Sequence, residues 1–207
     1  MTVSLYVSVP VCGLRKPYAR ELLESERVPP PSTVYGFLLS LVGEEDRRRY
    51  IGTRLKICLL STPEVSRILR TVWRIKDKNL PQGVGKNRTP DYQEILTGLE
   101  FAVWVQKGEL AGRIAEAFAS GHKSVRRFGG LSFGESKDLV DEIVFCPDWN
   151  AANEGKWLVS DPEGKYALPV WADHVASAGT RWRAFSLVSD TLAHPLKNDL
   201  RWIEIAP

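Results

Sequence analysis

Alternating apolar and polar residues mark the first predicted element of the chain. From Val3 to Val11, every odd position is Val or Leu, and Ser, Tyr or Pro lies between them. A period of two is typical of a strand with one buried face. The same alternation recurs in residues 54–60, 66–76 and 99–105, and a shorter apolar run spans 139–145. The pattern therefore predicts a strand in each of these segments.

The first helix is expected just after the triple proline at 29–31. The side-chain hydroxyl of Ser32 or Thr33 can cap its first turn, and Gly43 suits the left-handed residue that ends a helix. Apolar side chains occupy most positions from 34 to 42. This helix is therefore expected to be buried on most sides.

A second helix is predicted over residues 110–118. Leu110, Ile114 and Ala117 give it an apolar stripe, and Gly121 follows its end. A glycine-rich connection, Arg126 to Ser136, then leads to the last of the predicted strands named above.

The strand at 66–76 and the segment after it form a predicted arm. One face of the strand is apolar, which predicts contact with the core: Leu69, Thr71, Trp73 and Ile75. The opposite face is basic: Arg70, Arg74 and Lys76. Residues 77–98 contain several Pro and Gly residues and no sustained periodicity, so a long loop is expected there. We expect this loop to protrude before the chain returns in the strand at 99–105.

These elements follow the order of a β-α-β-β-α-β unit with one extra strand. The expected fold class is therefore α+β, with a ferredoxin-like (RRM-like) domain over residues 1–146 and the arm at about 77–98. After Pro147, short apolar runs are separated by Asp-Pro, Gly and His-Pro breaks. This pattern predicts a small β-rich C-terminal extension over residues 147–207.

Charge is unevenly distributed, although the formal net charge is only +3. Residues 66–88 contain seven Lys or Arg residues and one Asp, whereas residues 135–148 contain five acids and Lys137 alone as a base. Such segregation is what a local polyanion-binding site requires.

Composition narrows the class of protein. Hydrophobic residues make up 43% and charged residues 26% of the 207-residue chain, as in ordinary soluble domains. No stretch approaches the roughly 20 apolar residues of a membrane span, and the N-terminus lacks the basic and apolar regions of a signal peptide. We therefore expect a cytoplasmic protein with no membrane partner.

Common catalytic and cofactor motifs are absent from the sequence, among them G-x-G-x-x-G, the P-loop, H-E-x-x-H and G-x-S-x-G. The cysteines are odd in number and lack a C-x-x-C pair, so Cys12, Cys58 and Cys146 are expected to be free, buried thiols. The histidines lack metal-ligand spacing. The sequence therefore predicts a protein without a metal or a cofactor.

Three segments carry candidate RNA-binding residues, because Lys and Arg bind phosphates and nearby aromatic rings stack on bases. In the arm they are Arg70, Arg74, Lys76, Lys78, Lys86, Asn87 and Arg88. In the connection after the first strand they are Arg15, Lys16 and Arg20. In the glycine-rich connection, backbone N–H groups can approach phosphate beside Arg126 and Arg127. The alternatives are a solvated charged face for the arm and a plain turn for the glycine-rich connection.

A metal-independent RNA-cleaving site is the alternative activity. His122, Lys123 and Tyr35 could together act on a 2′-hydroxyl and a 5′-oxygen as general base and acid. His122 alone among the candidates titrates near neutrality. Tyr35 lies in a helix expected to be buried, where its hydroxyl can satisfy a backbone group. We therefore expect the chain not to be a nuclease.

Three blocks of the sequence resemble the CRISPR-associated protein 5 family, a branch of the repeat-associated mysterious protein (RAMP) superfamily. The family's first-helix signature is similar to VPPPSTVYGFLLSLVGEED at 28–46. Its arm returning into a core strand is similar to KNRTPDYQEILTGLEFAVWV at 86–105, and its glycine-rich segment to FGGLSFGESKDLV at 128–140. The blocks occur in the family's order and lie within roughly the first 145 residues.

The resemblance implies a RAMP domain with a protruding thumb and a role in RNA-guided DNA targeting for antiviral defence. It implies a non-catalytic subunit of a type I Cascade effector that caps the 5′ handle of the guide RNA (crRNA). The first-helix signature adds Ser32, Thr33 and Tyr35 to the RNA-binding candidates.

The resemblance also implies partners. They are the backbone subunits of the CRISPR-associated protein 7 family, a large subunit of the protein 8 family, and target DNA near the protospacer-adjacent motif. The blocks are most similar to type I-B-like members, including those of Tn7-like transposons, which leaves docking of a transposition protein open. Certain relatives cleave repeat RNA, so an endoribonuclease that processes precursor crRNA remains the alternative function.

Overall fold

The computed structural model describes the chain at residues 1–17, 19, 22–73, 75–121, 125–127, 129–150, 152–175, 178–193 and 201–207. The elements in that part are β1 (Val3–Cys12), β2 (Leu22–Leu23), α1 (Pro31–Val42), β3 (Arg54–Leu59), β4 (Glu64–Trp73), the 3-10 helix η1 (Gly85–Asn87), β5 (Arg88–Val105), α2 (Glu109–Ala119), β6 (Glu142–Phe145), β7 (Glu154–Ser160), β8 (Tyr166–Trp171), β9 (Arg181–Thr191) and β10 (Ile203–Glu204). No helix among these residues is both long and apolar enough to cross a membrane. The α+β class predicted from the sequence is confirmed.

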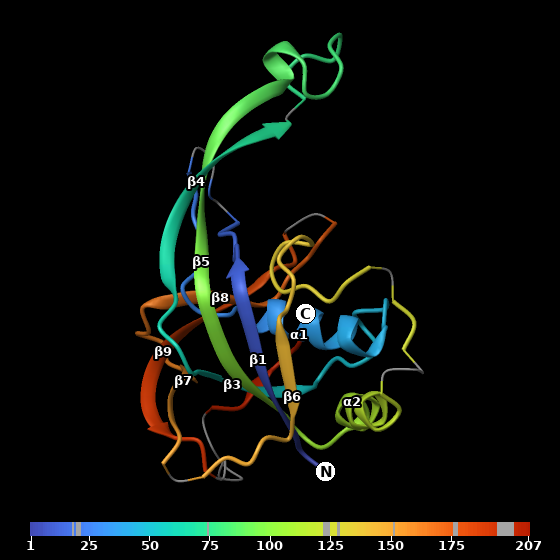
Figure 1. Ribbon diagram of the computed structural model, residues 1–207, viewed down its shortest axis with the longest axis vertical. Helices are drawn as coiled ribbons and strands as arrows, with labels where there is room; N and C mark the ends of the chain where they lie inside the picture. The colour runs from blue at the N-terminus through green and yellow to red at the C-terminus, as the bar shows by residue number, and fades with distance from the viewer. Residues whose placement is uncertain are drawn as a thin grey trace.

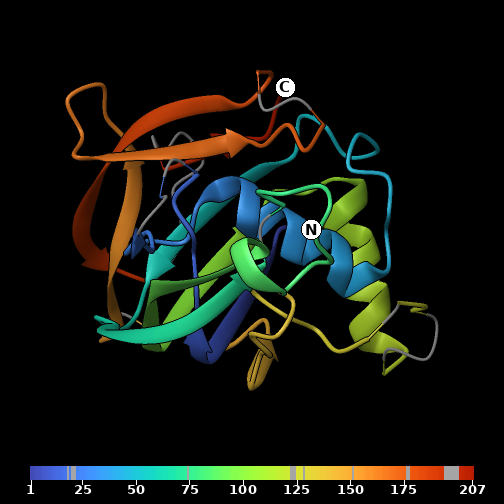
Figure 2. The ribbon, with the colours of Figure 1, turned by 90° about the horizontal axis from the view of Figure 1, so that it is seen from above.

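The described strands belong to one sheet, which is antiparallel except where β2 runs parallel to β5. The main path of the sheet is β6-β1-β5-β3-β7-β9-β8, with β10 beside β3 and β4 beside β5. Figure 1 shows β5 running through the middle of the molecule beside β1. Seen from above in Figure 2, the sheet curves, so that α1 lies between β1 and the end of the sheet formed by β8 and β9.

One apolar core joins α1 to strands from both ends of the sheet. Leu5 of β1, Leu38 of α1 and Phe185 of β9 are all fully buried in it. α1 is therefore buried on most sides, as its sequence predicted. The strands after residue 147 share this sheet and this core, and the division of the chain at that residue stays a prediction.

The sequence predicted the C-terminal end of α1 correctly but not the capping of its N-terminal end. α1 begins at Pro31, and neither Ser32 nor Thr33 caps it, because both lie within the first turn and no side-chain cap hydrogen bond forms. A proline at the first helical position has no N–H to satisfy, which reduces the need for a cap. Gly43 ends the helix with φ +69° as predicted, and a Cβ there would collide with the carbonyl oxygen of Arg126.

The central strands are covered on both faces, which the sequence did not predict. Lys56 occupies a polar position in the alternation of β3, yet its side chain is fully buried, as is that of Cys58. Cys58 belongs to a second cluster with Trp104 and Trp157, whose ring centroids are 4.7 Å apart, and the Nζ atom of Lys56 lies 4.6 Å from the centroid of the Trp202 ring. The thiols of Cys12 and Cys58 are free and buried as expected, whereas Cys146 is exposed.

The β4–β5 hairpin projects far beyond the rest of the molecule (Figure 1). Residues 88–98 were expected to be loop, but they form the first part of β5 and pair with β4 from Thr97↔Glu64 to Arg88↔Trp73. The ladder hydrogen bonds of this pairing hold the part of the strand that extends past the body of the protein, whereas Leu96 near its base is buried in the core.

The apolar face of β4 was expected to pack on the core, and this prediction is wrong. Leu69 is 64% exposed and Trp73 67% exposed, and Ile75 just beyond β4 is 64% exposed. The hairpin extends past the body of the protein, so few of the described residues cover this face. An alternating pattern therefore identified the strand but not its surroundings.

Candidate nucleic-acid interface

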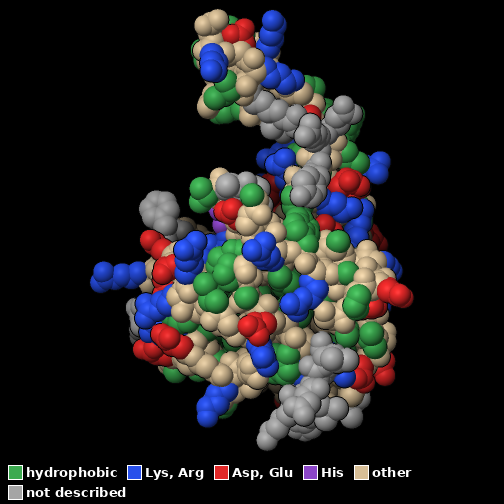
Figure 3. All heavy atoms as spheres, turned by 180° about the vertical axis from the view of Figure 1, so that it is seen from behind, with side chains coloured by type: hydrophobic (Ala, Val, Ile, Leu, Met, Phe, Trp, Pro, Cys, Tyr) green, Lys and Arg blue, Asp and Glu red, His purple; other side chains and the backbone are tan. Residues whose placement is uncertain are grey.

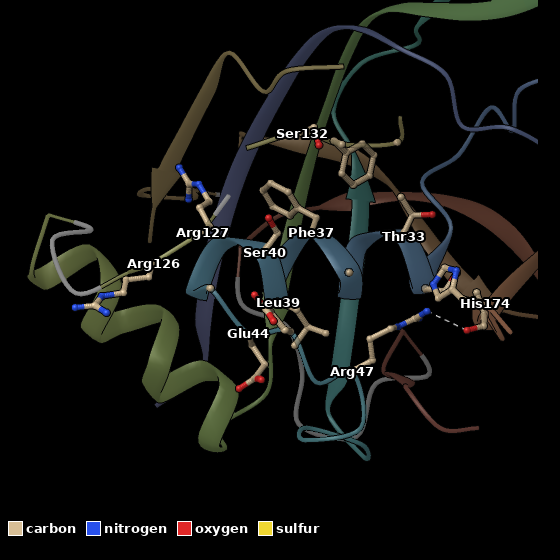
Figure 4. Close-up of a pocket in the computed structure, with 17 residues that line it drawn as sticks. Thr33, Phe37, Leu39, Ser40, Glu44, Arg47, Arg126, Arg127, Ser132 and His174 are labelled. Carbon is tan, nitrogen blue, oxygen red and sulfur yellow. Dashed lines mark hydrogen bonds between the residues drawn. The ribbon is translucent and has the colours of Figure 1, made fainter. Parts of the chain in front are cut away.

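A groove of about 470 Å³ runs along the partly exposed side of α1. Thr33, Gly36 and Ser40 form its floor, because residues three and four apart lie on the same side of a helix. Residues of the glycine-rich connection form one wall, among them Ser132, which Figure 4 labels. Phe133 also lines the groove. Small side chains and hydroxyl groups on the floor give a ligand close access to the helix.

Both ends of the groove carry positive or titratable side chains, as Figure 4 shows. Arg126 and Arg127 lie near the C-terminal end of α1 and are exposed, and the side chain of Arg126 points away from the floor. Arg47 and His174 lie near the other end. Partial burial and the charge of Arg47 together lower the pKa of His174.

The groove therefore contains some sequence-predicted residues and others that the sequence did not reveal. Ser32, Thr33, Arg126 and Arg127 line it as members of two separate predicted segments. Arg47 and His174 were not predicted. They reach the groove from a charged turn and from the segment after β8, and neither segment has a motif.

Arg47 is held in a defined position. Its Nη1 donates a hydrogen bond to the carbonyl oxygen of Ala172 at 3.0 Å, and its guanidinium carbon lies 5.1 Å from the centroid of the Trp171 ring. The Tyr35 hydroxyl donates a hydrogen bond to the backbone oxygen of Arg47 at 2.8 Å. Partial burial lowers the pKa of the Arg47 guanidinium.

Tyr35 does not face the groove, although the resemblance placed it among the RNA-binding candidates. The residue is fully buried, and burial raises the pKa of its hydroxyl to about 12. The sequence had predicted that this hydroxyl can satisfy a backbone group, which is confirmed. His122 and Lys123, the other members of the candidate cleavage site, lie outside the described residues.

A second basic surface lies at the tip of the β4–β5 hairpin (Figure 3). Its exposed cations are Lys76, Lys78, Lys86 and Arg88. Asn87, another predicted RNA-binding residue, is fully buried between them. Its Oδ1 accepts hydrogen bonds from the backbone N–H groups of Lys76 and Asp77 at 2.7 and 2.8 Å, and its Nδ2 donates to the carbonyl oxygens of Asp77 and Leu80 at 2.8 Å. The geometry gives Asn87 the role of ordering the tip.

The base of the hairpin is less basic than the sequence suggested. Arg70 donates hydrogen bonds to Glu135, with a shortest separation of 3.0 Å, and to the side-chain oxygen of Gln93. Burial acts to raise the pKa of Glu135, but the hydrogen bonds and charges of Arg70 and Lys137 outweigh it and hold that pKa below its usual value. The charge of Arg70 is therefore largely committed within the protein.

Three further cations near the base of the hairpin have carboxylate partners. The buried carboxylate of Glu94 accepts hydrogen bonds from Arg27 at 3.0 Å and from Arg67 at 3.4 Å. Lys16 lies 3.8 Å from the Glu24 carboxylate.

A recess of about 290 Å³ lies beneath the hairpin. Arg15, Arg70, Trp73 and Glu135 contribute to its lining. Two of the predicted RNA-binding residues, Arg15 and Arg70, thus lie in the same recess. Arg20 and Arg74 lie outside the described residues.

The described part of the chain offers no obvious place for a metal ion. No group of three or more His, Cys, Asp or Glu side chains is arranged there to hold one. The groove combines arginines, hydroxyl groups and aromatic rings with the carboxylates of Glu44 and Glu45, and its cations and hydroxyl donors suit an anionic polymer.

Comparisons with known proteins identify the chain's relatives. No family model matches it. It is 38% identical, over 211 residues that cover 99% of this chain and 98% of the relative, to the CRISPR-associated protein Cas5 of Myxococcus xanthus (strain DK1622).

Solved structures with 14% sequence identity share the fold. One is a chain of a CRISPR RNA-guided surveillance complex, with a TM-score of 0.65 and coverage of 92% of this chain and 90% of that chain. Another is the crystal structure of a Cas protein, with a TM-score of 0.52 and coverage of 93% and 95%. The relationship to the Myxococcus protein extends over nearly the whole length of both sequences, and the chain therefore belongs to the Cas5 family of CRISPR-associated proteins.

Proposed function

We propose that this protein binds the 5′ handle of a CRISPR guide RNA as a non-catalytic subunit of a type I Cascade effector. The observation that carries the proposal is the groove along α1, where hydroxyl groups, three glycines and three arginines line one concave surface together with Glu44 and Glu45. An RNA backbone is bound by cations together with hydroxyl and backbone donors. The Cas5 relative and the fold shared with a chain of an RNA-guided complex support the same function.

The tip of the hairpin supplies a second set of contacts in this proposal. The side chains of Lys76, Lys78, Lys86 and Arg88 are exposed there, and none forms an ion pair within the described part of the chain. Free cations release counterions when they meet a phosphate backbone. We expect these residues to contribute more to RNA affinity than Arg70, whose charge Glu135 already balances.

The exposed apolar side of the hairpin suits contact with other effector subunits. Leu69 of β4 pairs directly with Tyr92 of β5, and both side chains are more than half exposed. We propose that this side contacts backbone subunits of the Cas7 family. The large subunit of the Cas8 family and target DNA near the protospacer-adjacent motif complete the proposed set of partners.

The state of Tyr35 supports a non-catalytic role. Its hydroxyl is already bonded to the Arg47 carbonyl oxygen, and its raised pKa makes it a poor base near neutrality. It also has no exposed surface from which to position a ribose hydroxyl.

Binding of the purified protein to 5′-handle RNA tests the proposal. We expect affinity to fall steeply between about 50 and 200 mM salt, because phosphate contacts dominate. Lys78→Glu combined with Lys86→Glu should weaken binding more than Lys165→Glu, which reverses a charge that lies 4.9 Å from the Tyr166 ring, in the loop before β8. Affinity that does not change with salt, or equal losses in these variants, would contradict the proposal.

Cleavage is tested in the same mixtures. Repeat RNA incubated with the protein and a chelator should remain intact. A specific cut that disappears in His122→Ala would favour the endoribonuclease alternative and refute the non-catalytic assignment.

A further inference from the structure

We propose that Arg47 is a phosphate-binding residue of the groove along α1 and that β8 fixes it in place, so that the C-terminal strands complete the RNA-binding site. This inference rests on the proposed function and assigns a role to the C-terminal region. The ligand is the sugar-phosphate backbone of a single RNA strand.

The first support is the way in which Arg47 is anchored from three directions. The Trp171 ring lies beneath its guanidinium, the Ala172 carbonyl oxygen accepts from Nη1, and the Tyr35 hydroxyl holds its backbone oxygen. Two of these anchors, Trp171 and Ala172, come from β8 and the residue after it. A guanidinium already restrained by the protein loses less conformational entropy when it binds a ligand.

The second support is the hydrogen-bonding capacity that remains. An arginine side chain has five N–H donors, and Nη1 uses one of them on Ala172. Nε is buried and has no partner within the described residues. A buried donor left unpaired is costly, and in this conformation Nε has no surface that a ligand can reach. Nη2 is not among the buried unpartnered atoms and carries two N–H groups, so it is the donor that a phosphate in the groove can reach.

The third support is that no carboxylate within the described residues pairs with Arg47. Arg27, Arg67 and Arg70 each form an ion pair with a glutamate. Glu44, an acid that lines the groove, pairs instead with Arg49 at 3.1 Å. The charge of Arg47 is thus directed at the groove, where it contributes to the lowered pKa of His174.

The shape of the groove favours an extended strand over a small anion. Thr33 and Ser40 on its floor are seven residues apart, or about 10 Å along the helix axis at 1.5 Å per residue. Arg47 stands near one end and Arg127 near the other (Figure 4). A strand laid along the floor would meet a cation at each end.

The inference is tested by measuring the affinity of variants for 5′-handle RNA at several salt concentrations. The variants change Arg47 or Trp171, and a variant at Arg48 is the control. Arg47→Gln should weaken binding roughly tenfold or more and reduce the slope of log affinity against log salt by about 0.7, the value for one phosphate contact on a single strand. Arg47→Lys should keep the slope but bind less tightly than the wild type, because lysine lacks the planar fork. Arg48→Gln removes an exposed charge outside the groove and should leave affinity and slope unchanged.

The contribution of β8 is tested at Trp171. Trp171→Leu removes the ring beneath the guanidinium and should weaken binding while keeping the salt slope, since the charge remains. Trp171→Phe keeps an aromatic ring and should restore part of the lost affinity. Thermal unfolding shows which variants remain folded. If Arg47→Gln or Trp171→Leu does not fold, the conservative variants Arg47→Lys and Trp171→Phe still test the inference.

The possible failures are distinguishable. A wild-type protein that does not bind handle RNA refutes the proposed function. Normal affinity and slope in Arg47→Gln, with losses in a double variant at Arg126 and Arg127, would overturn this inference and leave the proposed function intact. Normal RNA binding by Arg47→Gln with lost assembly into the effector would instead make the groove a protein interface.

Discussion

The Tyr35 hydroxyl donates a 2.8 Å hydrogen bond to the backbone carbonyl oxygen of Arg47, which joins the buried side of α1 to the turn that follows it. The aromatic ring that places this hydroxyl also packs near Trp171, with ring centroids 6.4 Å apart. A residue that the sequence analysis placed in a candidate RNA-cleaving site thus has a structural task. It holds a groove-lining arginine by its backbone.

Removing this hydroxyl should affect stability. Tyr35→Phe leaves the Arg47 carbonyl oxygen without its partner and should lower the free energy of unfolding by about 1 kcal/mol, the usual net value of such a bond. Urea denaturation followed by fluorescence measures the change. Precursor RNA processing in cells that supply a dedicated ribonuclease should stay normal. A loss of processing with unchanged stability would point to chemistry at Tyr35.

Asn87 should control the order of the hairpin tip. Asn87→Ala removes side-chain bonds to the backbone at Lys76, Asp77 and Leu80, so the tip should lose its defined shape. We expect faster amide hydrogen exchange in residues 75–87 and weaker RNA binding, with little change in the midpoint of global unfolding. Asn79→Ala is the matched control, because the exposed Asn79 side chain forms no such bonds among the described contacts.

The contact between the hairpin and the glycine-rich connection should depend on pH. The pKa of Glu135 is held below its usual value near 4.5 in the folded protein, so the stabilisation from its ionised form is fully present above that value. It should disappear as the pH falls through the lower folded pKa. Unfolding measured from pH 7 to pH 3 should show the wild type losing its advantage over Glu135→Gln across this range. A difference that stays constant with pH would mean that the Glu135 charge does not matter.

The exposed apolar side of β4 should matter for assembly rather than for folding. Leu69→Ser should change the free energy of unfolding by no more than about 0.5 kcal/mol, as surface substitutions usually do. A leucine in the core would cost roughly 2–5 kcal/mol if truncated. Co-purification with the other effector subunits should nevertheless decrease. Leu59→Ser, at a buried position of β3, provides the contrast and should destabilise the isolated chain.

Local sequence patterns predicted much of this fold, and the failures have physical causes. Alternation located β1, β3 and the second half of β5, and Gly43 marked the end of α1. In β5, Leu96 and Leu99 are both buried although they are three positions apart, and Gly98 between them has φ +68°. The buried leucines thus change from an even to an odd position across Gly98, which interrupts the period that a strand prediction needs.

The candidate site was less predictable, because its contacts join distant parts of the chain. Arg47 and its acceptor at Ala172 are 125 positions apart in sequence. Nothing in the charged turn distinguishes Arg47 from Arg48 or Arg49. Likewise, the sequence predicted the basic residues of β4 but not the carboxylates that neutralise them. Glu94 reaches Arg67 because β5 pairs with β4, and Glu135 reaches Arg70 from the glycine-rich connection.

The length of β5 has a mechanical consequence. This strand continues without a break for 18 residues from the hairpin tip to the centre of the sheet, or about 60 Å at roughly 3.3 Å per residue. Its inner half is clamped between β1 and β3. A force applied at the tip is therefore transmitted along β5 to the middle of the sheet. The length of the strand also sets the distance between the tip and the body of the protein.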